Sequence, residues 1–147
     1  MNVLSIASTI AARFLPENVT PPSGYQDIRQ ASALIGSTIT PPSVLVFPPE
    51  LAVTNFTGGT RTAVLSFPVR FYYTTPPAQP RDVTGLYRWS EVLLDQLVGN
   101  TQLGGSPVAQ AYTAALRIAE FEYDGQPYDG VEMDVSVTVS EGVSPTA

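Results

Sequence analysis

The sequence predicts an α+β fold in which an antiparallel sheet of about four strands packs with two helices, joined by long proline-rich loops. Two segments have the apolar periodicity of amphipathic helices, and several others alternate apolar and polar residues as half-buried strands do. Fourteen prolines and eleven glycines in 147 residues favour many turns over long helices. A chain of this length is most simply one domain, spanning residues 1–147.

The first helix is expected at residues 3–14, where apolar side chains recur at the spacing of one helical face, and Pro16 would end it. Residues 16–42 contain two proline pairs and little pattern, with room for one helical turn over residues 29–35. An irregular stretch of this length is uncommon in a compact domain unless it serves a partner.

Strands are expected in the middle of the chain. Residues 43–47 form a short apolar run between proline pairs, and residues 48–61 are either a long loop or a loose hairpin with Gly58–Gly59 at its tip. Residues 62–75 alternate clearly, with five apolar or aromatic side chains on one face. Pro68 lacks an amide donor, which predicts a sheet edge or a bulge there.

A second helix should begin at Asp82 or Thr84 and end at Gly99. Its apolar stripe comprises Leu86, Trp89, Leu93 and Leu97, so we expect Trp89 to lie in the core rather than to bind a ligand. A final hairpin should pair residues 112–123 with 128–139. The tail, residues 140–147, is expected to be mobile.

The chain contains no cysteine, no histidine and no lysine. It therefore has no thiolate nucleophile, no side chain that ordinarily titrates near neutrality, and no lysine for a Schiff base. There is also no Gly-x-Ser-x-Gly elbow, and the glycines at 104–105 have no phosphate-loop context. These absences favour a binding or assembly protein over an enzyme, and no cofactor or metal is expected.

The net charge of −6 argues against binding nucleic-acid phosphates, because such binding needs clustered basic side chains. Only 14% of the residues are charged, which suggests that a partner covers part of the surface. The N-terminal segment is expected to be an amphipathic helix rather than a signal peptide, and no apolar run is long enough to span a membrane. We therefore expect a soluble protein made inside the cell.

The final hairpin is strongly acidic. If its turn, residues 124–127, pairs Phe121 with Val131, then Glu120 faces Glu132. Like charges directly opposite one another are destabilising, so such a face needs an explanation. Three remain open: a hard-cation site, a plain solvated face, and a negative surface such as the wall of a channel. The four acidic candidates are Glu120, Glu122, Glu132 and Asp134.

Arginine and aromatic residues in the middle of the chain are candidates for an interface. Arg70 and Tyr72 are expected to face outward among apolar neighbours, where arginine either anchors a partner or extends its charge past a sheet edge into solvent. Phe56 and Arg61 belong to the 48–61 segment, which we expect to contact a partner.

Three segments taken together resemble a known family. They are the helix end Leu93–Leu97, the stretch Thr101–Gly105 that follows it, and the acidic hairpin Ala119–Val135. Their order, with the length of the chain, is similar to that of the tail terminator proteins of long-tailed bacteriophages. The resemblance is firmest over residues 86–139. The family usually has a short connection after its first helix, whereas this chain has a long proline-rich one.

The resemblance implies a non-enzymatic virion protein, assembled in the host cytoplasm, that forms a homo-oligomeric ring, typically a hexamer. The ring caps the tail tube protein, stops its polymerisation and provides the docking surface for the head–tail connector or stopper. Genomic DNA passes through the lumen without specific binding, and no membrane is involved. In this setting the four acidic candidates would face the lumen and repel DNA phosphates.

Two other interpretations of the function remain open. Another neck or tail component, such as a tail tube subunit or a connector stopper, is the nearer one, although those proteins are predominantly β and the two expected helices count against it. A metal-dependent hydrolase that uses the four acidic candidates belongs to a different class of protein.

Overall fold

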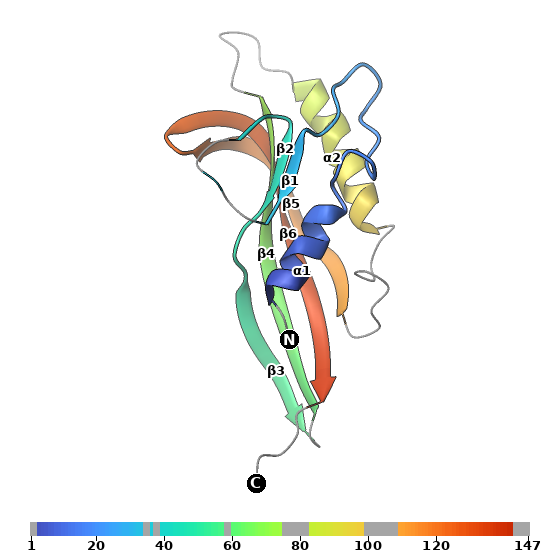
Figure 1. Ribbon diagram of the computed structural model, residues 1–147, viewed down its shortest axis with the longest axis vertical. Coiled ribbons are helices and arrows are strands. Elements are labelled where there is room, and N and C mark those ends of the chain that lie inside the picture. The colour runs from blue at the N-terminus through green and yellow to red at the C-terminus, as the bar shows by residue number, and fades with distance from the viewer. Residues whose placement is uncertain are drawn as a thin grey trace.

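The computed structural model describes residues 3–33, 36, 39–57, 60–74, 83–98 and 109–142 (Figure 1). These residues form two helices and one sheet of six strands. The elements are α1 (Val3–Ala12), β1 (Gln30–Ser32), β2 (Ser43–Val46), β3 (Glu50–Thr57), β4 (Thr60–Thr74), α2 (Val83–Val98), β5 (Ala109–Tyr123) and β6 (Gln126–Gly142). The α+β prediction is confirmed, as are both helices, with α1 ending two residues earlier than expected.

The sheet has the strand order β1-β2-β4-β6-β5, and β3 pairs with β4 beyond the end of β2. All pairs are antiparallel except β1 with β2, so the sheet is mixed and larger than predicted. The helical turn expected over residues 29–35 is wrong, because Gln30–Ser32 is a strand. The Arg29 amide donates to the Pro42 carbonyl at 2.7 Å, which fixes this short strand beside β2.

The segment 48–61 forms a hairpin whose register shifts between Val53 and Asn55, so the second of its two predicted alternatives is confirmed; Gly58 and Gly59 lie outside the described residues. Pro68 lies in β4 where its neighbouring strand changes from β2 to β3. Its carbonyl accepts from the Phe47 amide at 2.8 Å. Because the N–H and C=O of one strand residue point to the same side, the missing amide of Pro68 falls at this break and leaves the β4–β6 ladder intact.

Both helices cover the same face of the sheet, α1 over β1 and β2 and α2 over β5 and β6 (Figure 1). The main core lies between the two helices and the sheet. It contains the predicted stripe of α2 together with the apolar residues of β4 and β6. Its largest members are Trp89, Phe14, Phe67, Phe71, Ile10, Ile28, Leu65, Leu86, Leu93 and Leu97, all buried. The core position predicted for Trp89 is confirmed, and its ring centroid lies 4.8 Å from that of Phe71.

A second, smaller core lies on the opposite face of the sheet. Leu45, Tyr72, Phe121 and Tyr123 form it, and the Tyr123 hydroxyl donates to the carbonyl of Gly36. The turn end of the β5–β6 hairpin curls strongly at this point (Figure 1). At the other end of the molecule, β3 and the adjoining parts of β4 and β6 extend past α1 as an arm. Since β6 continues to Gly142, the tail expected to be mobile from residue 140 is ordered for its first three residues; residues 143–147 lie outside the described part.

Candidate functional site

The two faces of the sheet differ in chemistry, and we call them the helix face and the open face. Along β6, Val131, Met133 and Val135 are fully buried on the helix face. Glu132 and Asp134 alternate with them and therefore lie on the open face. The same alternation places Phe67, Val69 and Phe71 of β4 against the helices, as predicted, and Arg70 on the open face.

The register of the final hairpin differs from the predicted one by three residues. Only Asp124 and Gly125 form the turn, with φ angles of 51° and 78°. Both angles suit a two-residue turn whose twist matches that of the strands. Phe121 then faces Tyr128, and Arg117 rather than Glu120 faces Glu132.

This register divides the four acidic candidates between the two faces. Glu132 and Asp134 lie on the open face, whereas Glu120 and Glu122 pair with Asp129 and Pro127 and lie on the other. The prediction of four carboxylates on one face is therefore wrong. Within the described ranges, no group of three or more acidic residues lies close enough to hold a metal ion.

One row of residues crosses four strands on the open face. Leu45 of β2, Arg70 of β4, Glu132 of β6 and Arg117 of β5 are direct neighbours across the sheet. Arg70 Nε donates to Glu132 Oε2 at 2.7 Å, and an Arg117 terminal nitrogen donates to Glu132 Oε1 at 2.9 Å. The carboxylate thus holds β4 and β5 together through β6, and we call these three residues the Arg–Glu–Arg ladder.

Two aromatic rings support the ladder. The Arg70 guanidinium lies 5.2 Å from the centre of the Phe47 ring and 5.0 Å from that of Phe121, and Arg117 lies 5.5 Å from Phe121. These distances are within the range of cation–π attraction. Since Arg70 is engaged on three sides by its own chain, a role for it at an interface would be shared with a structural one.

The side chain of Glu132 is only 16% exposed. Burial by itself would raise its pKa, but the hydrogen bonds and positive charges of Arg70 and Arg117 outweigh that effect and hold the pKa below its ordinary value. A lowered pKa means that the folded state favours the ionised carboxylate. The resulting stabilisation is present above the ordinary pKa and is lost as the pH falls through the lowered one.

Replacing Glu132 with glutamine should therefore lower the free energy of unfolding at pH 7 by about 1–3 kcal/mol, because the partly buried Arg70 guanidinium loses its charged acceptor; the exposed Arg117 contributes little to the loss. The difference from the wild type should shrink as the pH falls below the ordinary glutamate pKa. Denaturant unfolding at pH 7 and pH 3 measures both values. Asp134→Asn, on the same face but exposed, is the matched control. A difference that does not change with pH would contradict the role given to the ladder.

Tyr72, expected to face outward at an interface, lies on the open face but is fully buried in the second core. Burial raises the pKa of its phenol, and the neighbouring Arg70 charge offsets this only in part. Its hydroxyl and that of Ser43, which lies directly opposite in β2, are both buried without a hydrogen-bond partner of good geometry in the described part of the chain. Tyr72 therefore acts first as a core residue.

The other two interface candidates belong to the arm. Phe56 of β3 faces Arg61 of β4 near the tip of the hairpin. Their backbone positions are described, but their side chains lie outside the described part of the structure.

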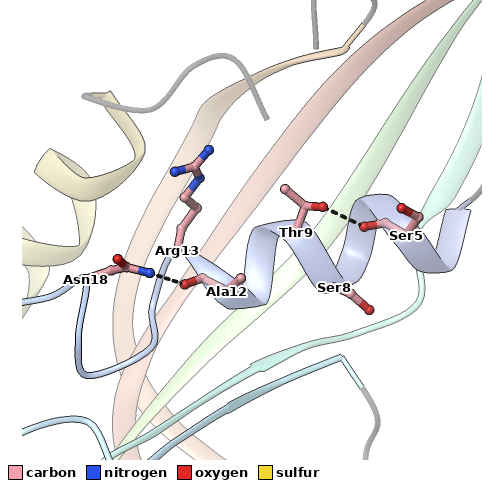
Figure 2. A pocket seen from close by; sticks show the side chains of 6 residues that line it. All are labelled: Ser5, Ser8, Thr9, Ala12, Arg13 and Asn18. Atoms are coloured by element: carbon pink, nitrogen blue, oxygen red, sulfur yellow. Dashed lines mark hydrogen bonds between the residues drawn. The ribbon is translucent and has the colours of Figure 1, made fainter. Parts of the chain in front are cut away.

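A polar pocket of about 390 Å³ lies along the outer side of α1 (Figure 2). It is lined by Ser5, Ser8, Thr9, Ala12, Arg13 and Asn18. The Thr9 hydroxyl donates to the Ser5 carbonyl at 2.8 Å, and the Asn18 amide donates to the Ala12 carbonyl at 2.7 Å. The lining has hydroxyls and one guanidinium but no carboxylate, so it lacks a nucleophile–base pair. Sequence reasoning missed this pocket, although small residues recur there at helical spacing.

A second, apolar hollow of about 330 Å³ lies between α1 and the end of β2. We call it the α1 groove; it is lined by Val3, Leu4, Ala7, Ala33, Val46, Phe47, Pro48 and Pro49. Large apolar side chains are exposed at its rim and elsewhere. They are Leu4, Leu51, Val83, Tyr87 and Leu94. Such residues match the low charged fraction of the sequence, which suggested that a partner covers part of the surface.

Comparison with known proteins adds no relative to this description. No protein-family model matches the chain, and no curated protein matches it. Neither helix of the described chain is long and apolar enough to cross a membrane.

Proposed function

We propose that the chain is a tail terminator subunit of a long-tailed bacteriophage. In this role it forms a ring, expected to be a hexamer, that caps the tail tube, stops its growth and joins it to the head connector. The proposal rests first on the resemblance carried by the order of elements. The observation that supports it best is the presence of large exposed apolar side chains on both helices of a weakly charged chain. Such surfaces suit contacts between subunits.

The arm supports the same role. It reaches beyond the helices and carries a strand, β3, that pairs on one side only within the described residues (Figure 1). An extended arm of this kind can contact a tail tube or a neighbouring subunit. The 48–61 segment, expected to contact a partner, forms most of its outer edge.

The open face is the best candidate for the lumen wall. Between the Arg–Glu–Arg ladder and the arm, the open-face positions of β4 and β6 have hydroxyls at Thr62, Ser66 and Thr138, with the exposed carboxylate of Asp134; Ser136 in the same row is buried. These positions carry no basic side chain. A neutral to acidic wall would not hold DNA phosphates, which suits a channel that must let the duplex pass. Glu132 is paired with the two arginines of the ladder, so its charge is already balanced. Of the two acidic candidates on the open face, Asp134 is the one that would face the lumen.

Native mass spectrometry and negative-stain imaging of the purified protein test the ring. We expect a closed oligomer, consistent with six copies, that binds one end of preformed tail tubes and blocks further addition of tube protein. A tube subunit would instead elongate the tubes, and a connector stopper would leave their growth unchanged. A protein that stays monomeric with and without tubes would contradict termination.

A further inference from the structure

The tripeptide Tyr-Asp-Gly occurs twice in the β5–β6 hairpin, and the fold gives the two copies opposite surroundings. The first copy, Tyr123–Gly125, includes the turn, where Asp124 and Gly125 are both exposed. The second copy, Tyr128–Gly130, lies in β6, where Asp129 is 2% exposed and Gly130 is buried. Asp-Gly occurs nowhere else in the chain, so the molecule presents the same dipeptide once in a turn and once in its core.

An Asp-Gly pair can rearrange without an enzyme. The glycine nitrogen bonds to Cγ of the protonated aspartyl carboxyl, and the hydroxyl leaves with the amide proton as water. Glycine favours this closure of a succinimide ring because it has no Cβ in the way. Water then adds to one of the two ring carbonyls. Addition at Cγ restores aspartate. Addition at the main-chain carbonyl breaks its bond to the glycine nitrogen and leaves isoaspartate, whose main chain runs through Cβ and Cγ. One water is lost and one is gained.

The turn copy has the freedom that ring closure requires. A Cβ atom at Gly125 would meet nothing within 4 Å, so there is open space beside this glycine. Within the described residues, no hydrogen bond or ion pair holds the Asp124 carboxylate. The turn is closed by the pair Tyr123–Gln126, and the next pair, Glu122–Pro127, includes a proline that has no amide to donate. The turn can therefore change its backbone angles by local opening, while the sheet stays folded.

The strand copy lacks that freedom. β6 lies between β4 and β5, and Gly130 pairs with Tyr72 on one side and with Ala119 on the other. A Cβ atom at Gly130 would collide with the main-chain carbonyl of Phe71, so a neighbouring strand fills the space beside this glycine. Ring closure at Asp129 would need β4 and β6 to separate, which opens the core itself.

We propose that Asp124–Gly125 is a site of spontaneous isoaspartate formation, and that the fold protects Asp129–Gly130 from the same reaction. The inference does not depend on the ring function proposed above. It follows from the exposure and the strand pairing of two identical dipeptides.

The modification has a consequence beyond the turn. Isoaspartate adds one main-chain atom to a two-residue turn whose length sets the register of β5 against β6. That register places Phe121 opposite Tyr128 in the second core, and Arg117 opposite Glu132 in the Arg–Glu–Arg ladder. Conversion of Asp124 should therefore weaken both the second core and the ladder.

Ageing of the full-length protein tests the selectivity. The folded protein is incubated at mildly acidic pH, well below its thermal midpoint, and isoaspartate at each position is measured by electron-transfer mass spectrometry. Asp124 should convert at least about tenfold faster than Asp129, because only the turn reacts through local opening. In denaturant the two positions should convert at similar rates. Equal rates in the folded protein would overturn the inference, and so would an unchanged preference for Asp124 in denaturant.

Two variants serve as controls, because Gly-Gly and Asn-Gly also suit this type of turn. Asp124→Gly removes the carboxyl, so isoaspartyl methyltransferase should label the aged variant at least about tenfold less than the aged wild type. Asp124→Asn should form isoaspartate faster at pH 7, since it expels ammonia and needs no protonated carboxyl. Equal labelling of Asp124→Gly and the wild type, or slower conversion of Asp124→Asn, would contradict a succinimide at this turn.

Thermal unfolding tests the consequence for the fold. The isoaspartyl form, separated from the unconverted protein by ion exchange, should unfold at a midpoint at least about 2 °C lower. Asp124→Gly aged in parallel should keep its midpoint, which separates the effect of the turn from other damage. An isoaspartyl form with an unchanged midpoint would overturn the link between the turn and the register.

Discussion

Replacing Trp89 with alanine should lower the free energy of unfolding by about 3–5 kcal/mol. The indole is fully buried between α2 and the sheet, with its ring 4.8 Å from that of Phe71. It is the largest buried side chain of the described core, so its truncation removes a large apolar area and leaves a cavity that the surrounding strands cannot close. Denaturant unfolding of the dilute protein at pH 7 measures the loss.

Two variants of the same helix sharpen this test. Arg88→Ala changes the neighbouring exposed residue and should stay within about 0.5 kcal/mol of the wild type. Trp89→Phe should cost about half of the alanine loss or less, because it keeps an aromatic ring and removes a buried indole N–H that has no hydrogen-bond partner in the described part of the chain. Equal losses of unfolding free energy in Trp89→Phe and Trp89→Ala would contradict the conclusion that packing of an aromatic ring at this position stabilises the core.

Replacing Gly130 with alanine should lower the free energy of unfolding by about 1–3 kcal/mol or more. A Cβ atom at this position would lie 2.1 Å from the carbonyl oxygen of Phe71 and 3.2 Å from its carbonyl carbon. These are backbone atoms of the central strand, in the part of β4 where the pairing with β6 contains an irregularity between Tyr72 and Thr74. The added methyl group can be accommodated only if β4 and β6 move apart, which strains both cores.

Gly36→Ala is the control, since a Cβ there meets nothing within 4 Å and the backbone is not in the left-handed region. It should leave stability unchanged or raise it slightly, because alanine restricts the unfolded chain. Thermal unfolding of the two variants side by side gives the comparison. A Gly130→Ala midpoint equal to that of Gly36→Ala would show that the close approach of β4 and β6 is not a constraint on the fold.

The fold was predictable where the pattern was local and regular. The periodicity of residues 3–14 and the stripe around Trp89 located both helices, and the alternation along residues 62–75 identified the buried face of β4. By contrast, the three residues of β1 have no periodicity of their own. They form a strand because the Arg29 amide meets the Pro42 carbonyl and aligns them with β2, a contact between residues 13 positions apart.

The candidate site was less predictable, because its charges come from three strands. The predicted pairing of Phe121 with Val131 would oppose Glu120 and Glu132, whereas the two-residue turn at Asp124–Gly125 opposes Arg117 and Glu132. The Asp-Gly pair is a strong signal for a two-residue hairpin turn, so the sequence did contain the information for this register. Nothing in the local pattern pointed to the approach of Arg70 from β4.

The sequence by itself determined the chemistry of each face: which residues of a strand or helix are apolar, which are charged, and that the inventory has no cysteine, histidine or lysine. Only the tertiary structure decided which of those residues meet. It paired one carboxylate with two arginines, divided the acidic residues between two faces, and left large apolar side chains exposed on both helices. The physical reason is that side-chain alternation is a property of neighbouring residues, whereas register depends on turn geometry and on contacts between distant parts of the chain.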